Sequence, residues 1–273
     1  MICPRPFVKY VGGKGQLIEE LLKHVPKTFK DYHEPMVGGG ALYWALVRGG
    51  HLVGKSVALA DTNEALIQTY QEIRNDPERL IRTLQLYADQ YVRQGGDLFY
   101  AIRDAWNAGV TNPARFIFLK QTAFNGLWRC NRKGEINMPW GQYEKPKILD
   151  AENIRACAQA LQGQGVWKAE FEASSQMVKK GDLVYFDPPY WGCFDAYSPE
   201  GFSQGQHLDL IRHCALLSAS GVYVIYSNED VREVRGALKK FWKSGKVHSV
   251  QSRRFINCDG EGREPVLDLI VTS

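Results

Sequence analysis

The stretch Asp182-Leu-Val-Tyr-Phe-Asp-Pro-Pro-Tyr190 decides the fold of this chain. Its apolar and aromatic run, 183–186, is typical of a short buried strand. Pro188 and Pro189 have no N–H group, so they cannot continue a sheet ladder and the backbone must leave the sheet there. In an open α/β sheet, ligands bind at the carboxyl ends of the strands. The sequence therefore predicts a strand that ends in a ligand site at Asp187.

The groups at this turn suit a reaction at an amine. The Asp187 carboxylate and the Pro188 carbonyl are adjacent acceptors for an NH₂ group, and Tyr190 offers a flat ring to stack on the base that carries it. The exocyclic amine of adenine is a poor nucleophile because its lone pair is conjugated into the ring. Two positioned acceptors would favour sp³ character and aim the lone pair at an electrophile. For a motif this short, a strand followed by a proline turn and a surface tyrosine remains an alternative interpretation.

Length and composition are those of a folded globular protein. The 273 residues suffice for one large domain or a core with an inserted second domain, and 44% apolar with 23% charged residues is ordinary. A net charge of +4 does not by itself nominate a polyanionic partner. The six cysteines are scattered without a Cys-x-x-Cys pair, so neither a zinc site nor a disulfide framework is indicated. Without a signal-like or membrane-length apolar run, we expect no membrane association and a cytoplasmic location.

Two glycine-rich segments precede the central stretch. Phe7-Val-Lys-Tyr-Val-Gly-Gly-Lys14 leads into a helical pattern, which taken alone is better explained as a loop that turns into a helix. Asp31-Tyr-His-Glu-Pro-Met-Val-Gly-Gly-Gly40 reads as a strand, a glycine turn and the start of a helix over 41–47. Such a turn forms a cradle for a nucleotide-like or adenosyl ligand, and Glu34 before it could bind a ligand ammonium. Because no Gly-x-Gly-x-x-Gly pattern is present, a nicotinamide cofactor is disfavoured.

A second buried strand, 56–60, ends in Asp61-Thr62-Asn63. An acid at the end of the strand that follows the glycine turn, about twenty residues on, is placed to bind ribose hydroxyls. The alternative is a helix N-cap, since Asp, Thr and Asn all cap well. Both interpretations can hold for different residues of the triplet.

From Asn75 to about Gln162 the apolar spacing becomes helical and the strand–turn–helix order stops. The segment from Thr111 to Lys147 contains seven basic residues and two acids, Glu135 and Glu144, so its net charge is +5. The basic residues are Arg115, Lys120, Arg129, Arg132, Lys133, Lys145 and Lys147. Interleaved with Phe124, Trp128 and Trp140, they suit phosphate neutralisation and base contacts. A solvated loop with some buried aromatics is the alternative.

After Gly165 the alternation of strands and helices returns. We expect strands over 166–171, 183–186, 222–226 (ending in Ser227-Asn228), 246–250 and 266–272, with helices over 208–217 and 231–241. The predicted fold is α/β, a Rossmann-like sheet split by a mostly helical insert. The predicted domains are a catalytic domain over 1–74 and 164–273 and an inserted DNA-recognition domain over 75–163.

These segments, in this order, resemble the Dam-type DNA adenine-N6 methyltransferases along almost the whole chain. The resemblance is carried by Lys9-Tyr-Val-Gly-Gly-Lys14, Glu34-Pro-Met-Val-Gly-Gly-Gly40, Ala60-Asp-Thr-Asn63, Phe124-Asn-Gly-Leu-Trp-Arg129, Lys133-Gly-Glu-Ile-Asn-Met-Pro139, Asp187-Pro-Pro-Tyr190 and Ser227-Asn228. Each motif is weak alone, but seven in sequence are specific. The resemblance implies transfer of a methyl group from S-adenosylmethionine to N6 of an adenine flipped out of duplex DNA, within GATC and with no metal.

The resemblance also implies roles for single residues. Asp187, Pro188 and Tyr190 match the catalytic motif. The implied cofactor-binding residues are Tyr10, Lys14, Glu34, Gly38, Gly40, Asp61, Glu170, Phe171 and Asp187. Met36 and Glu170 depart from the Phe and Asp that are common in the family.

The implied DNA-binding residues, which lie in the insert except for Lys9, read bases or contact the DNA backbone. Lys9 and Arg129 suit guanines, while Leu127 and Pro139 suit a thymine methyl. Phe124, which replaces a common Tyr, can still stack into the space that a flipped base leaves. The full set of implied DNA-binding residues is Lys9, Phe124, Asn125, Leu127, Arg129, Asn131, Lys133, Asn137 and Pro139.

Other functions stay open at this point. The same amine chemistry serves methylation of cytosine N4 or of an RNA base. An inactive DNA-binding regulator is a second class, although an intact Asp187-Pro-Pro-Tyr190 speaks against it. A protein-glutamine methyltransferase would carry an Asn-Pro-Pro-Tyr pattern and would leave the basic insert without a purpose. We expect a monomer in a bacterial or phage-infected cell, with duplex DNA as partner and a cognate restriction endonuclease as a candidate second partner.

Overall fold

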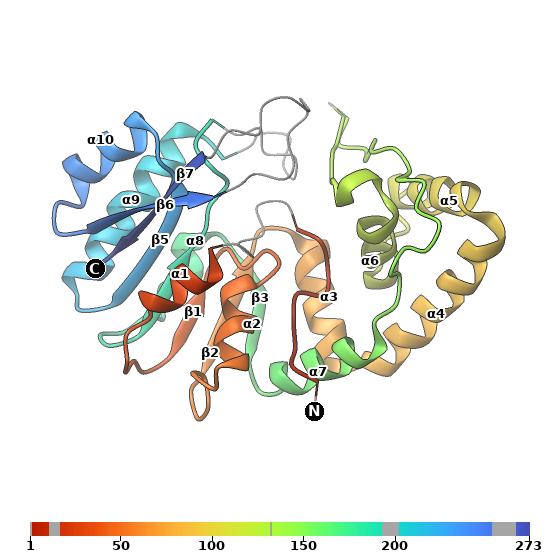
Figure 1. Ribbon diagram of the computed structural model, residues 1–273, viewed down its shortest axis with the longest axis horizontal. Coiled ribbons are helices and arrows are strands. Elements are labelled where there is room, and N and C mark those ends of the chain that lie inside the picture. The colour runs from red at the N-terminus through yellow and green to blue at the C-terminus, as the bar shows by residue number, and fades with distance from the viewer. Residues whose placement is uncertain (1, 11–16, 132, 193–201, 253–265) are drawn as a thin grey trace.

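The computed structural model describes residues 2–10, 17–131, 133–192, 202–252 and 266–273. Its centre is a seven-stranded sheet in the order β3-β2-β1-β4-β5-β7-β6 (Figure 1). Strands β1 to β5 pair in parallel, and β7 lies antiparallel between β5 and β6. The strands are β1 (Tyr32–Glu34), β2 (Val57–Asp61), β3 (Gly165–Lys168), β4 (Leu183–Phe186), β5 (Tyr223–Glu229), β6 (Lys246–Ser252) and β7 (Val266–Thr272). The predicted α/β sheet with a helical region between its strands is confirmed.

Strand β4 lies at the centre of the sheet because all four of its residues are apolar and fully buried. Successive side chains of a strand point to opposite faces. Leu183 and Tyr185 accordingly join the large core cluster on one face, whereas Val184 and Phe186 join a second cluster on the other. The site strand is thereby held rigidly from both sides.

Helices cover both faces of the sheet. Helices α1 (Ile18–Lys23) and α2 (Ala41–Arg48) contact each other, and α3 (Glu64–Asn75) packs on β2 and β3. The short helix α8 (Phe171–Ser174) contacts β2, while α9 (Gln204–Ala219) packs on β5 and contacts α10 (Arg232–Phe241). In the described part of the chain, no helix is long and apolar enough to cross a membrane.

The region between β2 and β3 is helical and lies to one side of the sheet (Figure 1). It comprises α4 (Pro77–Gln94), α5 (Gly96–Asn107), α6 (Pro113–Thr122), the 3₁₀ turn η1 (Phe124–Gly126) and α7 (Ala151–Leu161). Asp76, Asn112 and Asp150 cap α4, α6 and α7 by accepting from backbone N–H groups of the first turn. Prolines at the starts of α4 and α6 lack the N–H that would be unsatisfied there.

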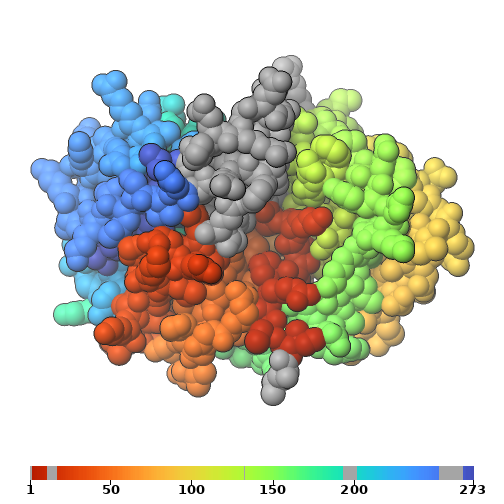
Figure 2. Space-filling model, viewed as in Figure 1, coloured from red at the N-terminus to blue at the C-terminus, as the bar shows by residue number. Residues whose placement is uncertain are grey.

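The N-terminal segment joins the two parts of the molecule. The Arg5 N–H donates to Asn153 Oδ1 (3.0 Å), and Asn153 Nδ2 donates to the Arg5 carbonyl (3.1 Å). Figure 2 shows this segment, in dark red, between the orange helices of the sheet domain and the green part of the helical region. Further along this segment, Lys9 packs on Gly126 of the helical region, while Tyr10 packs on Gly38 of the sheet and lies beside Lys120 of the helical region.

Two details of the predicted strands are corrected. The strand predicted over 166–171 ends at Lys168, because Glu170 is the N-cap of α8 and Phe171 begins that helix. Strand β5 continues to Glu229, so Ser227 and Asn228 lie inside it and not after it. Pairing with β7, which continues along Ser227, Asn228 and Glu229, extends the strand beyond its apolar run.

Asp182 lies directly before β4, at the end of the strand away from Asp187, and its hydrogen bonds connect β4 to β1. This carboxylate, 3% exposed, accepts from His33 Nε2 (3.1 Å), the Lys179 N–H (2.8 Å) and the Asp31 N–H (3.4 Å). Burial lowers the pKa of His33, against the raising effect of Asp182. The pair thus links β1 to the entrance of β4.

We expect Asp182→Ala to lower the free energy of unfolding by roughly 2–4 kcal/mol, since it leaves buried donors without an acceptor. Urea unfolding followed by circular dichroism measures the change. Asp209→Ala is the matched control, because Asp209 makes only an exposed ion pair with Arg212, and it should change stability by less than about 0.5 kcal/mol. Equal effects of the two substitutions would contradict a stabilising role for the buried pair.

Candidate active site

Three acids from neighbouring strands meet at the carboxyl edge of the sheet. Glu34 ends β1, Asp61 ends β2 and Asp187 follows β4. The parallel registers of β1 with β2 and with β4 bring these strand ends to the same edge. Sequence reasoning placed each acid at the end of a strand, and the sheet order makes them neighbours.

The Asp187 carboxylate is oriented from β5. Ser227 Oγ donates to Asp187 Oδ1 (2.7 Å) and lies 3.0 Å from the hydroxyl of Tyr185. Ser227 is fully buried, and burial raises the pKa of the Tyr185 hydroxyl. A buried hydroxyl between two partners has little freedom, so it fixes the rotation of the carboxylate.

The chain after Tyr190 is held by the next residue of β5. Asn228 Oδ1 accepts from the Trp191 N–H (3.1 Å), and Asn228 Nδ2 donates to the Tyr226 hydroxyl (2.6 Å). Together, Ser227 and Asn228 fix the turn from Asp187 to Trp191 at both ends. Pro188 is buried and Tyr190 half-buried within this turn.

The glycine turn after β1 is braced by Asp61. Asp61 Oδ2 accepts from the Gly38 N–H (2.9 Å), and Oδ1 accepts from the Asn63 N–H (2.9 Å). Asn63 itself caps α3 by accepting from the Leu66 N–H (3.1 Å). The capping interpretation is therefore confirmed for Asn63, whereas Asp61 faces the glycine loop.

Only glycine fits this turn. Gly38 and Gly40 have φ values of 46° and 67°, in the left-handed region. A Cβ on Gly38 would lie 3.1 Å from the Tyr10 ring, and one on Gly40 would lie 2.7 Å from the Tyr70 hydroxyl. Tyr10 thus packs directly on the glycine loop, and its contact with the cofactor stays a prediction. Lys14, also predicted there, lies outside the described residues.

Glu34 is a buried acid near other acids. It is 1% exposed and accepts from the Tyr32 hydroxyl (2.7 Å). Burial raises the pKa of Glu34 to about 8, the Tyr32 hydrogen bond opposes this, and the negative charge of Asp187 adds to it. The site therefore presents an acid that would ionise when a cation binds beside it.

The two residues predicted to flank a cofactor adenine differ in exposure. Glu170 is exposed at the N-terminus of α8. Phe171 is 2% exposed, and its ring contacts those of Phe186, Phe202 and His213 edge-on. Phe171 thus belongs to the second core cluster beside β4.

A loop of the helical region forms a second part of the site. In η1, Phe124 is 50% exposed, and Asn125 has a φ of 52° followed by Gly126 at 64°. The Asn125 N–H donates to the Tyr143 hydroxyl (2.9 Å), and Lys9 Nζ lies 5.3 Å from the Tyr143 ring centroid. Lys9 also packs on Gly126, where a Cβ would be 3.0 Å from the Lys9 Cβ.

The hairpin after η1 separates buried from exposed side chains. Trp128 is 5% exposed and packs against Trp106 and Phe116. Leu127 and Arg129, on either side of it, point outward, since Leu127 is half-buried and Arg129 exposed. Lys133, Asn137 and Pro139 are also exposed on this hairpin.

Asn131 differs from the other predicted DNA-binding residues. Its Oδ1 accepts from the N–H groups of Lys133 (2.9 Å) and Glu135 (3.0 Å), and its Nδ2 donates to Glu135 Oε2 (2.8 Å). The side chain is thus used inside the hairpin turn. Glu135, which could have paired with Arg129, bonds to Asn131.

Lys120 is among the basic residues expected from the sequence to suit phosphate contacts, whereas Tyr143 has no predicted role. The expectation for Lys120 is corrected, because a fully buried side chain cannot reach a phosphate. Lys120 is fully buried in α6 and donates to the Gly126 carbonyl (3.0 Å). Both side chains hold the Asn125–Gly126 turn, Lys120 through the Gly126 carbonyl and Tyr143 through the Asn125 N–H. Local sequence gave no signal for either, because these contacts depend on how the loop folds back.

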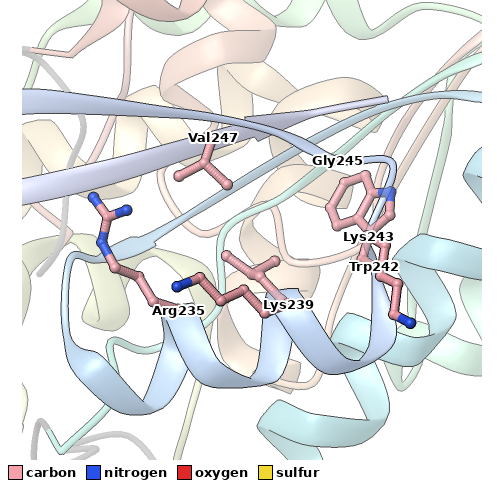
Figure 3. Close-up of a pocket in the computed structure, with 7 residues that line it drawn as sticks. Arg235, Lys239, Trp242, Lys243, Gly245 and Val247 are labelled. Carbon is pink, nitrogen blue, oxygen red and sulfur yellow. The ribbon is translucent and has the colours of Figure 1, made fainter.

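The structure also has a pocket whose lining includes none of the predicted site residues. It lies between α10 and β6 and is lined by Arg235, Leu238, Lys239, Trp242, Lys243, Gly245 and Val247 (Figure 3). Arg235 forms an ion pair with Asp230 there. Within the described residues, no group of three or more His, Cys, Asp or Glu side chains could hold a metal ion.

Comparisons with known proteins match this chain over most of its length. The model of the family "D12 class N6 adenine-specific DNA methyltransferase" matches residues 10–256. A type II methyltransferase, M.MjaIII of Methanocaldococcus jannaschii, is 32% identical, with 95% of each chain covered. M1.LlaDCHI of Lactococcus lactis subsp. cremoris, also a type II methyltransferase, is 30% identical over 98% of this chain and 95% of its own. A DNA adenine methylase of Escherichia coli (strain K12) is 29% identical over 97% of this chain and 94% of its own.

The raised pKa of Glu34 predicts a pH-dependent stability. A raised pKa in the folded state gives stability that is fully present below the unfolded pKa of 4.5 and is lost as pH rises through about 8. We therefore expect the free energy of unfolding of Glu34→Gln, relative to that of the wild type, to rise by roughly 2–4 kcal/mol from pH 5 to pH 8. Urea unfolding of both proteins at the two pH values checks this. Parallel stability curves would mean that Glu34 is already ionised in the fold.

Proposed function

Because the chain belongs to the D12 class of N6 adenine-specific DNA methyltransferases, we propose that it methylates adenine N6 within GATC sites of duplex DNA. The family assignment sets aside cytosine N4, RNA and protein amides as targets. The observation that carries the proposal of mechanism is the Asp187 carboxylate, fixed by Ser227 at the carboxyl end of β4. The family implies S-adenosylmethionine as cofactor and DNA as substrate.

The residues at the sheet edge fit this cofactor. S-adenosylmethionine supplies an electrophilic methyl group on a sulfonium and carries a cationic amine. Glu34, a buried acid with its pKa raised to about 8, gains a partner when a cation binds. Asp61 accepts from the Gly38 N–H, and Tyr10 packs on the same glycine turn. Asp61 is proposed to bind the ribose hydroxyls, and Tyr10, Gly38 and Gly40 are proposed to contact the same ligand. Glu170, Phe171 and Lys14 stay proposed contacts on the resemblance alone.

At the reacting amine, two acceptors act together. Asp187 and the Pro188 carbonyl are proposed to accept the hydrogens of adenine N6, which favours sp³ character and frees the lone pair for attack. Ser227 keeps the carboxylate in place before substrate arrives, so little reorganisation is needed during the reaction. Tyr190 is proposed to stack on the flipped base.

Base reading is proposed to lie mainly on the helical insert, with 75–163 as the recognition domain and the rest of the chain as the catalytic domain, from which Lys9 is proposed to reach a second guanine. Arg129 and Lys9 offer donors for guanines, and Leu127 and Pro139 offer apolar contact to a thymine methyl. The exposure of Arg129 and Pro139 on one hairpin supports this. Phe124, Asn125 and Asn137 are proposed to contact bases or to fill the vacated space, and Lys133 to contact phosphate. Asn131 is proposed to act on the DNA only by shaping the turn.

The names of the relatives do not fix the target sequence or the biological setting. Two of them are type II methyltransferases, which supports a cognate restriction endonuclease as a candidate partner. The DNA adenine methylase supports a solitary enzyme equally. The target site is therefore the part of the proposal that most needs a direct test.

Asp187→Ala is expected to lower single-turnover methylation by at least about a hundred- to a thousand-fold, because it removes a preorganised acceptor from the amine. Duplex affinity should change little, as measured by fluorescence anisotropy. Tyr190→Phe is the matched control, since the proposal needs its ring and not its hydroxyl, and it should keep near-wild-type turnover. Near-wild-type turnover of the Asp187 variant would remove this residue from the mechanism.

Arg129→Ala is expected to remove about 1–3 kcal/mol of discrimination against the wrong base at one base pair of GATC. Selectivity at the other positions should not change. A panel of duplexes that varies each GATC position measures this by kcat/KM. Lys133→Ala should weaken all duplexes alike and reduce the salt slope by about one. Uniform loss for Arg129→Ala would make it a backbone contact, and robust wild-type methylation outside GATC would overturn the proposed site.

A further inference from the structure

Lys120 is a buried lysine that contacts both the Asn125–Gly126 turn and Tyr10. It lies in the last turn of α6 and is 0% exposed. Burial lowers the pKa of Lys120 to about 7. A buried charge is costly, and an apolar side chain of similar length would fill this space at lower cost. The position therefore points to a role for the ammonium beyond packing.

One contact of this ammonium fixes the turn that presents the base-reading residues. Lys120 Nζ donates to the carbonyl of Gly126 (3.0 Å). Gly126 follows Asn125, and both have positive φ values (64° and 52°). Two consecutive left-handed residues are unfavourable where one is not glycine, so the turn needs external support. Lys120 supplies that support just before Leu127 and Arg129 emerge.

A second contact of Lys120, with Tyr10, leads toward the cofactor loop. Lys120 Nζ lies 5.1 Å from the Tyr10 ring centroid and 6.0 Å from that of Trp128, within range for cation–π attraction. The Tyr10 ring packs on Gly38, and the Gly38 N–H donates to Asp61. A continuous set of contacts thus runs from the base-reading turn to the proposed ribose-binding acid.

We propose that Lys120 is a positioning residue that couples the base-reading turn to the cofactor loop, so that cofactor and duplex bind cooperatively. The inference rests on the proposed function, because it assumes that one end of this contact path binds DNA and the other the cofactor. Coupling between sites is reciprocal: the duplex tightens cofactor binding by the factor with which the cofactor tightens duplex binding.

Isothermal titration tests the coupling with S-adenosylhomocysteine as the cofactor probe, in the absence and presence of saturating duplex. The duplex is the one that the substrate panel identifies, so a wrong assignment of GATC changes the probe and leaves the test intact. For the wild type we expect S-adenosylhomocysteine to bind about fivefold or more tightly in the presence of duplex. For Lys120→Met we expect this ratio to fall to within about twofold of one.

Lys55→Met is the matched control. Lys55 Nζ also contacts a backbone carbonyl and an aromatic ring, both of Phe29, but it lies before β2, away from the carboxyl edge. It should leave the ratio unchanged. Tyr10→Leu keeps the Lys120–Gly126 bond and removes the ring beside the ammonium, so it should also lower the ratio. This half-buried position keeps the proposal testable should Lys120→Met fold poorly.

A wild-type ratio near one, or an unchanged ratio in Lys120→Met, would overturn the proposal even in an active enzyme. Equal weakening of both ligands with the ratio preserved would do the same, because it would show a purely structural lysine. Absence of adenine methylation by the wild type would instead overturn the proposed function. The binding ratio and the methylation assay therefore separate the two failures.

Discussion

The parallel pairing of β1 with β4 at the centre of the sheet is the constraint on which the site depends. Tyr32 and His33 lie beside Leu183 and Val184, which sends both chains out of the sheet at the same edge. Glu34 and Asp187 are therefore close enough for the charge of one to raise the pKa of the other. Burial of Glu34 is the larger cause of its raised pKa, and a cation bound beside it would offset both the burial of its charge and the repulsion from Asp187.

The framework around these acids is made mainly of hydroxyl and amide groups. Ser227 and Asn228 of β5 hold the Asp187–Trp191 turn, and Asp61 holds the glycine loop. Each partner comes from an adjacent strand end, so its position follows from the sheet and not from a mobile loop. Geometry of this kind is set before substrate binds, as electrostatic catalysis demands.

The strands that the sequence predicts correctly are those marked by a local run of apolar residues. The apolar run 183–186 and the run 266–272 coincide with β4 and β7, because β4 is buried along its whole length and Leu269, Ile270 and Val271 form a buried centre in β7. The run into Phe171 misled, since its apolar side chain begins a helix that packs into the second core cluster. Lys120 was expected among the exposed phosphate contacts and Tyr143 was assigned no role, because their partners are set by the folding back of the hairpin and not by local pattern. Asp61 and Asn63 were predicted as alternatives, and the structure uses both residues differently.

The antiparallel placement of β7 has a consequence for how the enzyme is made. Strand β7 follows every other strand in sequence, yet it pairs with β5 along Ser227 and Asn228. During synthesis the outer edge of β5 stays open until β7 has left the ribosome, although the cofactor loop and the helical insert were completed long before. Asp187, the acid proposed to act on the amine, is therefore expected to gain its fixed support from Ser227 only at the last stage of folding. A nascent chain can acquire its surface for DNA before it acquires its catalytic geometry.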